Sequence, residues 1–182
     1  MCKSLTDYLH FSELDSTNDY AKQLIFKEKK TCPFVITTDF QLKGRGTHNK
    51  FWYSERDTQL LYSLTTFHES IKIDPRIIIP HTANCVKQMI KSVYETDVEI
   101  KEPNDLLING KKCAGILVES FSRGSKVWII FGLGLNINND YFDGDLKYNA
   151  TSLKIETGKT YDRSALIYPL TELLIQSFNK IV

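Results

Sequence analysis

An aspartate and a lysine flank a short turn near the middle of the chain. Asp105 precedes the dipeptide Asn109-Gly110, and Lys112 follows it. An Asn-Gly pair between two apolar runs predicts a two-residue hairpin turn, because both residues tolerate a positive φ. The carboxylate and the ammonium then become diagonal neighbours on one side of a sheet. Such a pair can bind an anion or accept a proton, and the alternative is a surface salt bridge without chemistry.

The turn also fixes the register of the hairpin, since a two-residue loop sets which residues lie opposite one another. Small residues at Ala114 and Gly115 leave room for a ligand to lie against the strand backbone. The expected pairs are Ile108 with Lys111, Leu107 with Lys112, and Asp105 with Ala114.

A second group with chemical potential is the loop around Gly44-Arg45-Gly46, which lies between Gln41 and Trp52. Two glycines allow the backbone to curl around an anion, and the guanidinium supplies a fixed charge with paired donors. By itself a Gly-Arg-Gly sequence is weak evidence, because glycine turns beside arginine are common. Trp52 has two interpretations, a wall of this site or a core residue.

The third group is Ser16-Thr17-Asn18, which also has two interpretations. Hydroxyl and amide side chains at the start of a helix form a cap, and the residues alone favour this interpretation. The same groups are suited to a buried, neutral polar ligand that needs matched donors and acceptors.

Hydrophobic spacing predicts the elements that position these groups. His81 falls inside a predicted helix and is interpreted as polar packing rather than as a catalytic residue. The predicted strands cover residues 10–14, 34–38, 59–65 and 127–136 together with the 101–119 hairpin, and the predicted helices cover 18–29, 75–95 and 164–180, with a polar loop at 137–149.

Composition limits the class of protein. The chain has 182 residues, 42% hydrophobic and 25% charged, and a formal net charge of +1, which argues against a protein that neutralises nucleic-acid phosphates. No apolar run is long enough to cross a bilayer, and residues 1–14 lack the features of a signal peptide, so a cytoplasmic protein is expected. The cysteines Cys2, Cys32, Cys85 and Cys113 lack metal-ligand spacing and are expected to be reduced packing residues.

Several motifs in order resemble those of biotin protein ligases. The hairpin resembles the family's KWPND and KLAGIL(V/I)E motifs, the Gln41–Trp52 loop resembles Gln-x-x-Gly-Arg-Gly…Trp, and Ser16-Thr17-Asn18 matches Ser-Thr-Asn. Residues 132–136 resemble the family's Gly-x-Gly-x-Asn. The chain departs from the family's motifs at several positions: Glu102 stands where the family has Trp, Gln59 takes the place of an Asn, and the arginine-rich loop is reduced to Gly44-Arg45-Gly46-Thr47-His48-Asn49-Lys50.

The resemblance implies an α/β fold of the class II synthetase-like biotin/lipoate ligase type, with a mixed, mostly antiparallel sheet and helices packed on one face. Residues 1–182 are expected to form a single catalytic domain without an N-terminal helix-turn-helix and without the C-terminal small barrel. No DNA and no membrane are expected as partners, and a homodimer is left open.

The implied activity is ATP-dependent ligation of biotin to a lysine of a biotin carboxyl carrier protein, an acetyl-CoA carboxylase subunit, through biotinyl-5′-AMP. ATP and Mg²⁺ are the implied cosubstrate and metal, and no metal ligand is assigned. The implied catalytic residues are Lys112, Arg45, Asp105 and Lys101. The implied biotin contacts are Ser16, Thr17, Asn18, Gln41, Gly44, Arg45, Gly46, Thr47, Lys112 and Gly115. The implied ATP contacts are Arg45, Lys50, Trp52, Asn104, Lys112 and Asn136.

Two other functions fit part of the pattern. A lipoate or octanoate transferase or ligase also acylates carrier lysines, and a non-catalytic biotin-binding protein would share the pocket. The Gln41–Trp52 loop and the hairpin match biotin ligases better, and Arg45 and Lys112 are both present. The loss of two arginines from the 44–50 loop further predicts faster release of biotinyl-5′-AMP than in arginine-rich relatives.

Overall fold

The computed structural model describes residues 7–69, 71 and 74–178. Its strands are β1 (Asp7–Phe11), β2 (Phe34–Thr38), β3 (Gln59–Glu69), β4 (Glu99–Lys101), β5 (Asp105–Ile108), β6 (Lys111–Arg123) and β7 (Lys126–Asn136). Its helices are α1 (Thr17–Glu28), α2 (Pro75–Tyr94), α3 (Leu146–Asn149), α4 (Leu153–Thr157) and α5 (Ile167–Phe178), with short 3-10 helices η1 (Thr47–Asn49) and η2 (Arg163–Leu166).

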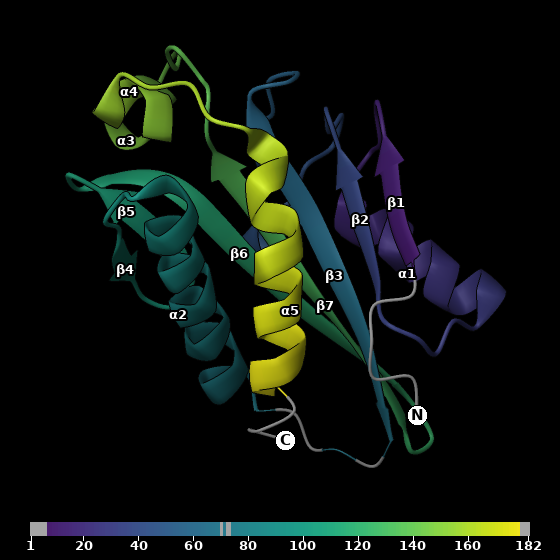
Figure 1. The fold of residues 1–182 in the computed structure, drawn as a ribbon. Helices are drawn as coiled ribbons and strands as arrows, with labels where there is room; N and C mark the ends of the chain where they lie inside the picture. The colour runs from purple at the N-terminus through teal and green to yellow at the C-terminus, as the bar shows by residue number, and fades with distance from the viewer. Residues whose placement is uncertain (1–6, 70, 72–73, 179–182) are drawn as a thin grey trace.

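The described strands form one seven-stranded sheet in the order β1-β2-β3-β7-β6-β5-β4 (Figure 1). β1 and β2 are parallel, and every other neighbouring pair is antiparallel. The long strands β3, β7 and β6 lie at the centre. The predicted α/β fold with a mixed, mostly antiparallel sheet is confirmed.

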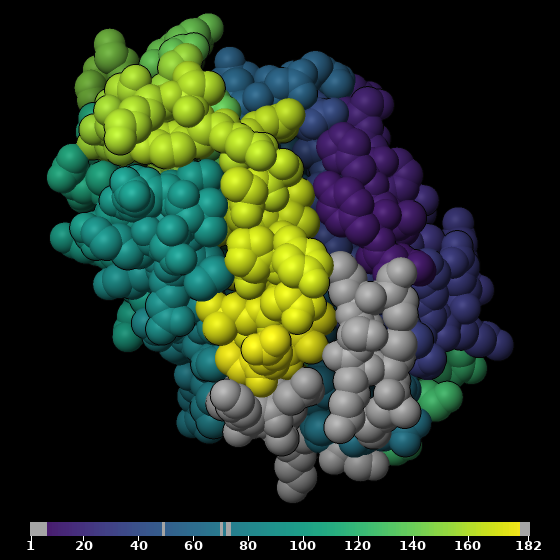
Figure 2. All heavy atoms as spheres, viewed as in Figure 1, coloured from purple at the N-terminus to yellow at the C-terminus, as the bar shows by residue number. Residues whose placement is uncertain are grey.

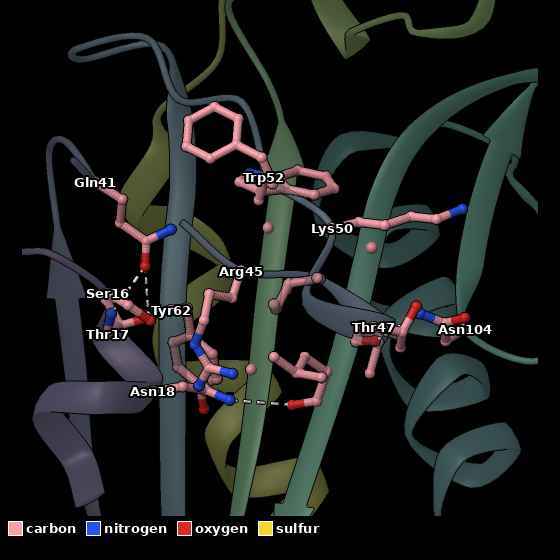
Figure 3. Close-up of a pocket in the computed structure, with 18 of the residues that line it drawn as sticks. Ser16, Thr17, Asn18, Gln41, Arg45, Thr47, Lys50, Trp52, Tyr62 and Asn104 are labelled. Carbon is pink, nitrogen blue, oxygen red and sulfur yellow. Dashed lines mark hydrogen bonds between the residues drawn. The ribbon is translucent and has the colours of Figure 1, made fainter. Parts of the chain in front are cut away.

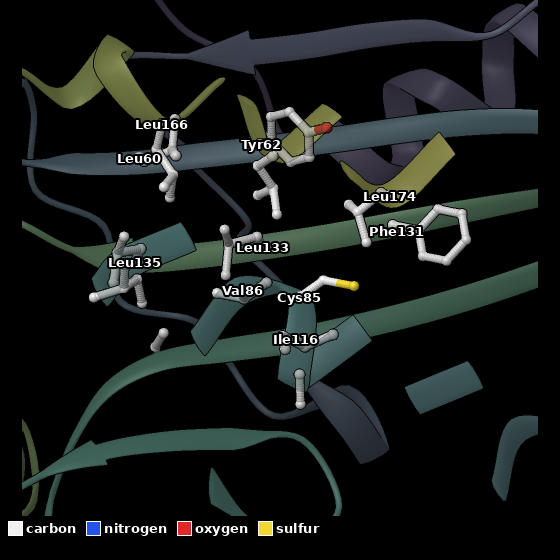
Figure 4. Close-up of a cluster of buried hydrophobic side chains, with 14 of the residues drawn as sticks. Leu60, Tyr62, Cys85, Val86, Ile116, Phe131, Leu133, Leu135, Leu166 and Leu174 are labelled. Atoms are coloured by element: carbon white, nitrogen blue, oxygen red, sulfur yellow. The ribbon is translucent and has the colours of Figure 1, made fainter. Parts of the chain in front are cut away.

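Helices α2 and α5 pack side by side on one face of the sheet, and their side chains cover it in Figure 2. Alternate residues of the central strands point toward these helices and form the larger buried cluster (Figure 4). Its members include Leu60, Tyr62, Val86, Ile116, Phe131, Leu133, Leu166 and Leu174.

Helix α1 packs on the opposite face of the sheet, whereas the prediction described helices on one face only. Ala21, Leu24 and Ile25 contact a smaller buried cluster that includes Phe34 and Ile130. Helix α1 covers only part of this face. The parts of β6 and β7 that lie beside the start of α1 are left uncovered by the helix.

Local sequence explains where the two long helices begin. Ser16 has an extended backbone, and its Oγ accepts a hydrogen bond from the amide of Asp19, so it caps α1. Asp74 caps α2 by accepting from the amide of Arg76 at 2.9 Å, with Pro75 at the first helical position. The capping interpretation of Ser16 is therefore confirmed.

Three details differ from the sequence predictions. The first strand lies at Asp7–Phe11 rather than at 10–14, and Leu14 instead forms an isolated bridge with Gln41. The predicted polar loop 137–149 ends in α3, and α4 follows it. The final helix is described through Phe178, so its predicted extension to residue 180 lies outside the described residues.

The hairpin register also differs beyond its second residue pair. Leu107 lies opposite Lys112 as predicted, but Asp105 lies opposite Gly115 rather than Ala114. A bulge places one extra residue, Cys113, in β6, and both Cys113 and Ala114 are buried in the core. The predicted pairing of Asp105 with Ala114 is wrong for this reason.

Candidate active site

A cavity of about 140 Å³ opens on the sheet face that carries α1 (Figure 3). It lies between the start of α1, the 44–52 loop and the glycine-containing parts of β6 and β7. It is lined by Ser16, Thr17, Asn18, Gln41, Arg45, Gly46, Thr47, Lys50, Phe51, Trp52, Tyr62, Asn104, Lys112, Gly115, Ile116, Leu117, Gly132, Leu133 and Gly134. Twelve of the sequence-predicted site residues are among them, so most of the predicted groups do come together.

One end of the cavity is neutral and polar. The backbone amide of Thr17 donates to Oε1 of Gln41 at 2.8 Å, and the Thr17 hydroxyl lies 3.1 Å from the same oxygen. The Gln41 side chain is thereby oriented with Nε2 facing the cavity, as Figure 3 shows. This end offers an N–H donor beside a hydroxyl oxygen, which suits a neutral ligand with both an acceptor and a donor.

Asn18 lines the same end, but the protein uses both parts of its amide. Its Oδ1 lies 2.6 Å from the Ser63 hydroxyl, and its Nδ2 donates to Glu119 at 2.8 Å. The remaining Nδ2 hydrogen faces the carbonyl of Leu117 at 3.4 Å. Asn18 therefore braces the pocket wall, while Gln41 and Thr17 present groups to a ligand.

Arg45 is fixed in a cluster of ion pairs. Its Nε and Nη2 donate to the two carboxylate oxygens of Asp19 at 2.9 and 2.6 Å, and Nη2 also lies 3.3 Å from Glu119. Lys22 contacts both acids, at 3.2 Å for Asp19 and 2.7 Å for Glu119. The two acids balance the two bases, and Nη1 of Arg45 has no partner among the described residues.

These contacts shift ionisation toward the charged forms. The hydrogen bonds that Arg45 donates to Asp19 are the main cause of a raised pKa for Arg45. Burial opposes ionisation of Asp19, but hydrogen bonds from Arg45 and Lys22 prevail and lower the pKa of this carboxyl. Arg45 thus carries a permanent charge that its neighbours largely neutralise.

Lys112 supplies positive charge at the side of the cavity formed by β6. Its Nζ lies 2.6 Å from Oδ1 of Asp105 and 5.4 Å from the centre of the Trp52 ring. Asp105 itself does not line the cavity, and it reaches the site through Lys112. Lys101 also lies outside the lining, on β4 opposite Asp105, and the structure pairs Asp105 with Lys112.

Trp52 lies flat on the sheet because glycines occupy the positions beneath it. Gly115 and Gly134 face each other across β6 and β7, and a Cβ atom at Gly134 would come within 2.7 Å of Trp52 Nε1. A Cβ at Gly115 would lie 2.7 Å from Trp52 Cζ3. Trp52 lines the cavity and is therefore a wall of it, and its indole Nε1 is buried without a hydrogen-bond partner among the described residues.

The two asparagines predicted to contact ATP lie in different places. Asn104 lines the cavity, and its Nδ2 donates to the carbonyl of Ile116 at 2.8 Å. Asn136 lies outside the lining, where its Oδ1 accepts from Gln59 at 2.7 Å and its Nδ2 donates to the carbonyl of Thr151 at 2.9 Å. Asn136 therefore holds two strands and the following segment together.

The 44–52 loop closes the remaining side. Gly46 donates to the carbonyl of Lys50 at 2.7 Å, so the loop folds back on itself through η1. The exposed side chain of Lys50 and the side chain of Thr47 both line the cavity (Figure 3). Gly44 does not line the cavity but supports it, since a Cβ there would lie 3.0 Å from Gln41 Nε2.

Sequence reasoning did not assign several residues of the site. Gly132 and Gly134 were part of a recognised motif, and a Cβ at Gly132 would lie 2.5 Å from Asn18 Oδ1. Asp19, Lys22 and Glu119 form the ionic cluster without lining the cavity. The signal for Glu119 was its place at the end of the hairpin motif, two strand residues beyond Leu117.

Protein groups for a metal are not assembled here. Among the described residues, no three His, Cys, Asp or Glu side chains lie together as metal ligands. Asp19, Glu119 and Asp105 each form an ion pair, so the carboxylates beside the cavity do not fit a protein-held Mg²⁺. The described residues also contain no helix that is long and apolar enough to cross a membrane.

Together, the fold and the cavity define an α/β protein with a polar cavity on one face of a mixed, mostly antiparallel sheet. A biotin protein ligase from Aquifex aeolicus, solved in complex with biotin and ATP, has this fold with a TM-score of 0.75 and 24% identity, over 98% of this chain and 72% of that one. The biotin protein ligase of Leishmania major in complex with biotin is also similar, with a TM-score of 0.68 and 23% identity over 96% and 81% of the two chains. The chain belongs to the biotin/lipoate A/B protein ligase family, whose model matches residues 11–136.

Among characterised relatives, the bifunctional ligase/repressor BirA of Bacillus subtilis is 33% identical over 164 residues, which make up 87% of this chain and 50% of that protein. This chain thus spans about half the length of the curated relatives that it matches.

Proposed function

We propose that this chain ligates biotin to a lysine of a biotin carboxyl carrier protein in two steps, the first of which consumes ATP. The observation that carries the proposal is the pairing, in one cavity, of a neutral donor and acceptor end with a cationic side. Gln41 and Thr17 suit the ureido ring of biotin, and Lys112 and Lys50 suit anions. The name of a relative from Paracoccus denitrificans, biotin-[acetyl-CoA-carboxylase] ligase, supports the choice of carrier.

The first step joins two anions. A carboxylate oxygen of biotin attacks the α-phosphorus of ATP, the bond from that phosphorus to the bridging oxygen breaks, and pyrophosphate leaves. Because like charges approach one another, the step requires fixed cations beside the phosphate oxygens. We assign this role to Lys112, and the position of its ammonium beside Trp52 and Gly115 at the cavity wall supports the assignment.

The second step transfers the biotinyl group. The carrier lysine attacks the acyl carbon of biotinyl-5′-AMP, the bond to the phosphate oxygen breaks, AMP leaves, and the amine loses a proton. A free lysine amine has a pKa of about 10.4, so it needs a proton acceptor at neutral pH. Asp105 is the candidate acceptor, held by Lys112 at 2.6 Å.

The experiment combines purified chain, biotin, ATP and a carrier domain, and follows biotinylation by streptavidin blot and mass spectrometry. We expect one added biotinyl group that depends on ATP and on the target lysine. The absence of any biotinylated carrier would overturn the proposal. Product that octanoate or lipoate suppresses at equal concentration would favour a lipoate or octanoate ligase, and biotin binding without turnover would favour a non-catalytic biotin-binding protein.

A further inference from the structure

Glu119 connects three groups at the floor of the cavity without lining it. Its carboxylate accepts from Asn18 Nδ2 at 2.8 Å and from Lys22 Nζ at 2.7 Å, and it lies 3.3 Å from Arg45 Nη2. The side chain is 19% exposed and projects from β6 toward α1. A small change at Glu119 therefore reaches the helix start, the 44–52 loop and the strand together.

The carboxylate imposes a direction on the hydrogen bonds that follow. An ionised carboxylate only accepts, so Asn18 must turn its Nδ2 toward Glu119 and its Oδ1 toward Ser63. Ser63 Oγ must then donate its single hydrogen to Asn18 across the 2.6 Å contact. The Ser63 oxygen is left to accept, and Thr17 Oγ1 lies 2.8 Å from it.

This order decides what Thr17 offers to a ligand. Because Ser63 donates its hydrogen to Asn18, it has none to donate to Thr17. The Thr17 hydroxyl then donates to Ser63 or to Gln41, and both lone pairs of the Thr17 oxygen stay available. If Asn18 were reversed, Ser63 would donate to Thr17 and use one lone pair. Gln41 keeps Nε2 toward the cavity in either case, because the Thr17 backbone amide fixes its Oε1.

We infer that Glu119 is a positioning residue that sets the donor and acceptor order of the pocket, so that a Gln41 N–H lies beside a Thr17 oxygen with both lone pairs available to accept. That pattern complements a cyclic urea, whose carbonyl accepts and whose N–H groups donate. The inference rests on the proposed function, because it takes biotin as the ligand. It adds that the recognition is controlled by a carboxylate that does not touch the ligand.

The test is calorimetric titration of biotin into the full chain without ATP or carrier. Glu119→Gln keeps the shape of the side chain, but its amide can donate to Asn18 Oδ1 and so permits the reversed order. We expect biotin to bind at least about ten-fold more weakly, the effect of one well-formed hydrogen bond. In steady-state assays KM for biotin should rise, while kcat at saturating biotin changes by less than about two-fold.

Lys22→Gln is the matched control, since it removes one charge from the same cluster and leaves the contact between Glu119 and Asn18 in place. We expect its biotin affinity to stay within about two-fold of wild type. Equal weakening by Lys22→Gln and Glu119→Gln would overturn the inference, because loss of charge would then explain both variants.

A double variant, Glu119→Gln with Asn18→Asp, moves the carboxylate one step along the chain of hydrogen bonds. The new carboxylate at position 18 again only accepts, so Ser63 must donate to it and the order near Thr17 is restored. We expect the double variant to bind biotin at least about five-fold more tightly than Glu119→Gln. Asn18→Asp alone should bind poorly, because two carboxylates then meet.

Several outcomes separate the inference from the proposed function. Wild type that fails to bind biotin would overturn the proposed function. Wild type and Glu119→Gln that bind equally would overturn only the role of Glu119, as would a double variant no better than Glu119→Gln. If Glu119→Gln does not fold by circular dichroism, Glu119→Ala replaces it, since it also removes the carboxylate that orients Asn18, and an unchanged affinity in that variant would equally overturn the inference.

Discussion

The Lys112 ammonium lies 2.6 Å from the Asp105 carboxylate, although a bulge at Cys113 separates the two residues in register. Cys113 and Ala114 both point into the core, so the bulge leaves Lys112 on the cavity face and moves Asp105 opposite Gly115. The pair therefore joins a cavity-lining cation to a carboxylate just outside the cavity. Its two members are expected to serve different steps.

Lys112→Ala is expected to suppress formation of biotinyl-5′-AMP by about 100-fold or more, because a cation beside the reacting phosphate is lost. The measurement is pyrophosphate release with biotin and ATP in the absence of carrier. Lys111→Ala is the control, since Lys111 is an exposed lysine on the same strand and does not line the cavity. A normal rate in Lys112→Ala would remove Lys112 from the first step.

Asp105→Asn is expected to slow biotin transfer more than adenylate formation, by about 10-fold or more, because the amide keeps the shape but cannot accept a proton. Preformed biotinyl-5′-AMP supplied with carrier isolates the second step. Lys101→Ala serves for comparison, because Lys101 lies opposite Asp105 in the sheet, whereas the carboxylate of Asp105 forms its ion pair with Lys112. Unimpaired transfer by Asp105→Asn would exclude Asp105 as the base.

Substitutions at two glycines of β7 are expected to affect different substrates, one raising KM for biotin and the other raising KM for ATP. Gly132→Ala brings a methyl group to 2.5 Å from Asn18 Oδ1, so KM for biotin should rise by about ten-fold. Gly134→Ala brings one to 2.6 Å from Trp52 Cζ2, so KM for ATP should rise by a similar factor. Steady-state kinetics with each substrate varied in turn would show the split, and equal effects of both variants on both substrates would contradict it.

The stability of the fold is expected to decrease between pH 7 and pH 5. Burial lowers the pKa of His68 and of His81 below the ordinary value of 6.5, so both are neutral in the folded chain. Below pH 6.5 the unfolded chain binds these protons first, and stability is lost as the pH falls through the folded-state pKa values. Thermal melts should show a shallower decrease for His68→Gln with His81→Gln, and an unchanged slope would argue against these histidines.

Thr47→Arg is expected to slow the release of biotinyl-5′-AMP. Asp19 and Glu119 already neutralise much of the Arg45 charge, so Lys50 is the loop residue left to attract phosphate. An added guanidinium at Thr47, which lines the cavity, restores a paired donor. Dissociation of labelled adenylate at fixed salt and pH tests this, with Thr47→Gln as the uncharged control, and equal rates in all three proteins would exclude loop charge.

Most of the fold could be predicted because its signals are local. The Asn109-Gly110 turn has positive φ at both residues as expected, and the apolar spacing of α1 and α2 located both helices to within about two residues. The bulge at Cys113 was not predictable in this way. Two consecutive inward-facing residues break the strand period of two, and small residues at 113–115 gave no sign of which position was extra.

The candidate site was predicted in membership but not in its connections. Arg45 was expected to face an anionic group of the ligand. In the structure it donates hydrogen bonds to the carboxylates of Asp19 and Glu119, which lie 26 and 74 residues away along the chain. Asn136 was expected at the nucleotide and instead bonds to Gln59 and Thr151. Such partners depend on which strands become neighbours, and one sequence does not specify that.

The segment after β7 has a consequence for how the hairpin opens. Ala150 pairs with Lys112 in a parallel bridge, and the buried Thr151 donates its amide hydrogen to the carbonyl of Lys112 at 2.9 Å. Deuterium can replace that hydrogen only when this contact separates. The exchange rate at Thr151 therefore reports how often the strand that carries Lys112 detaches, read from a residue outside the hairpin.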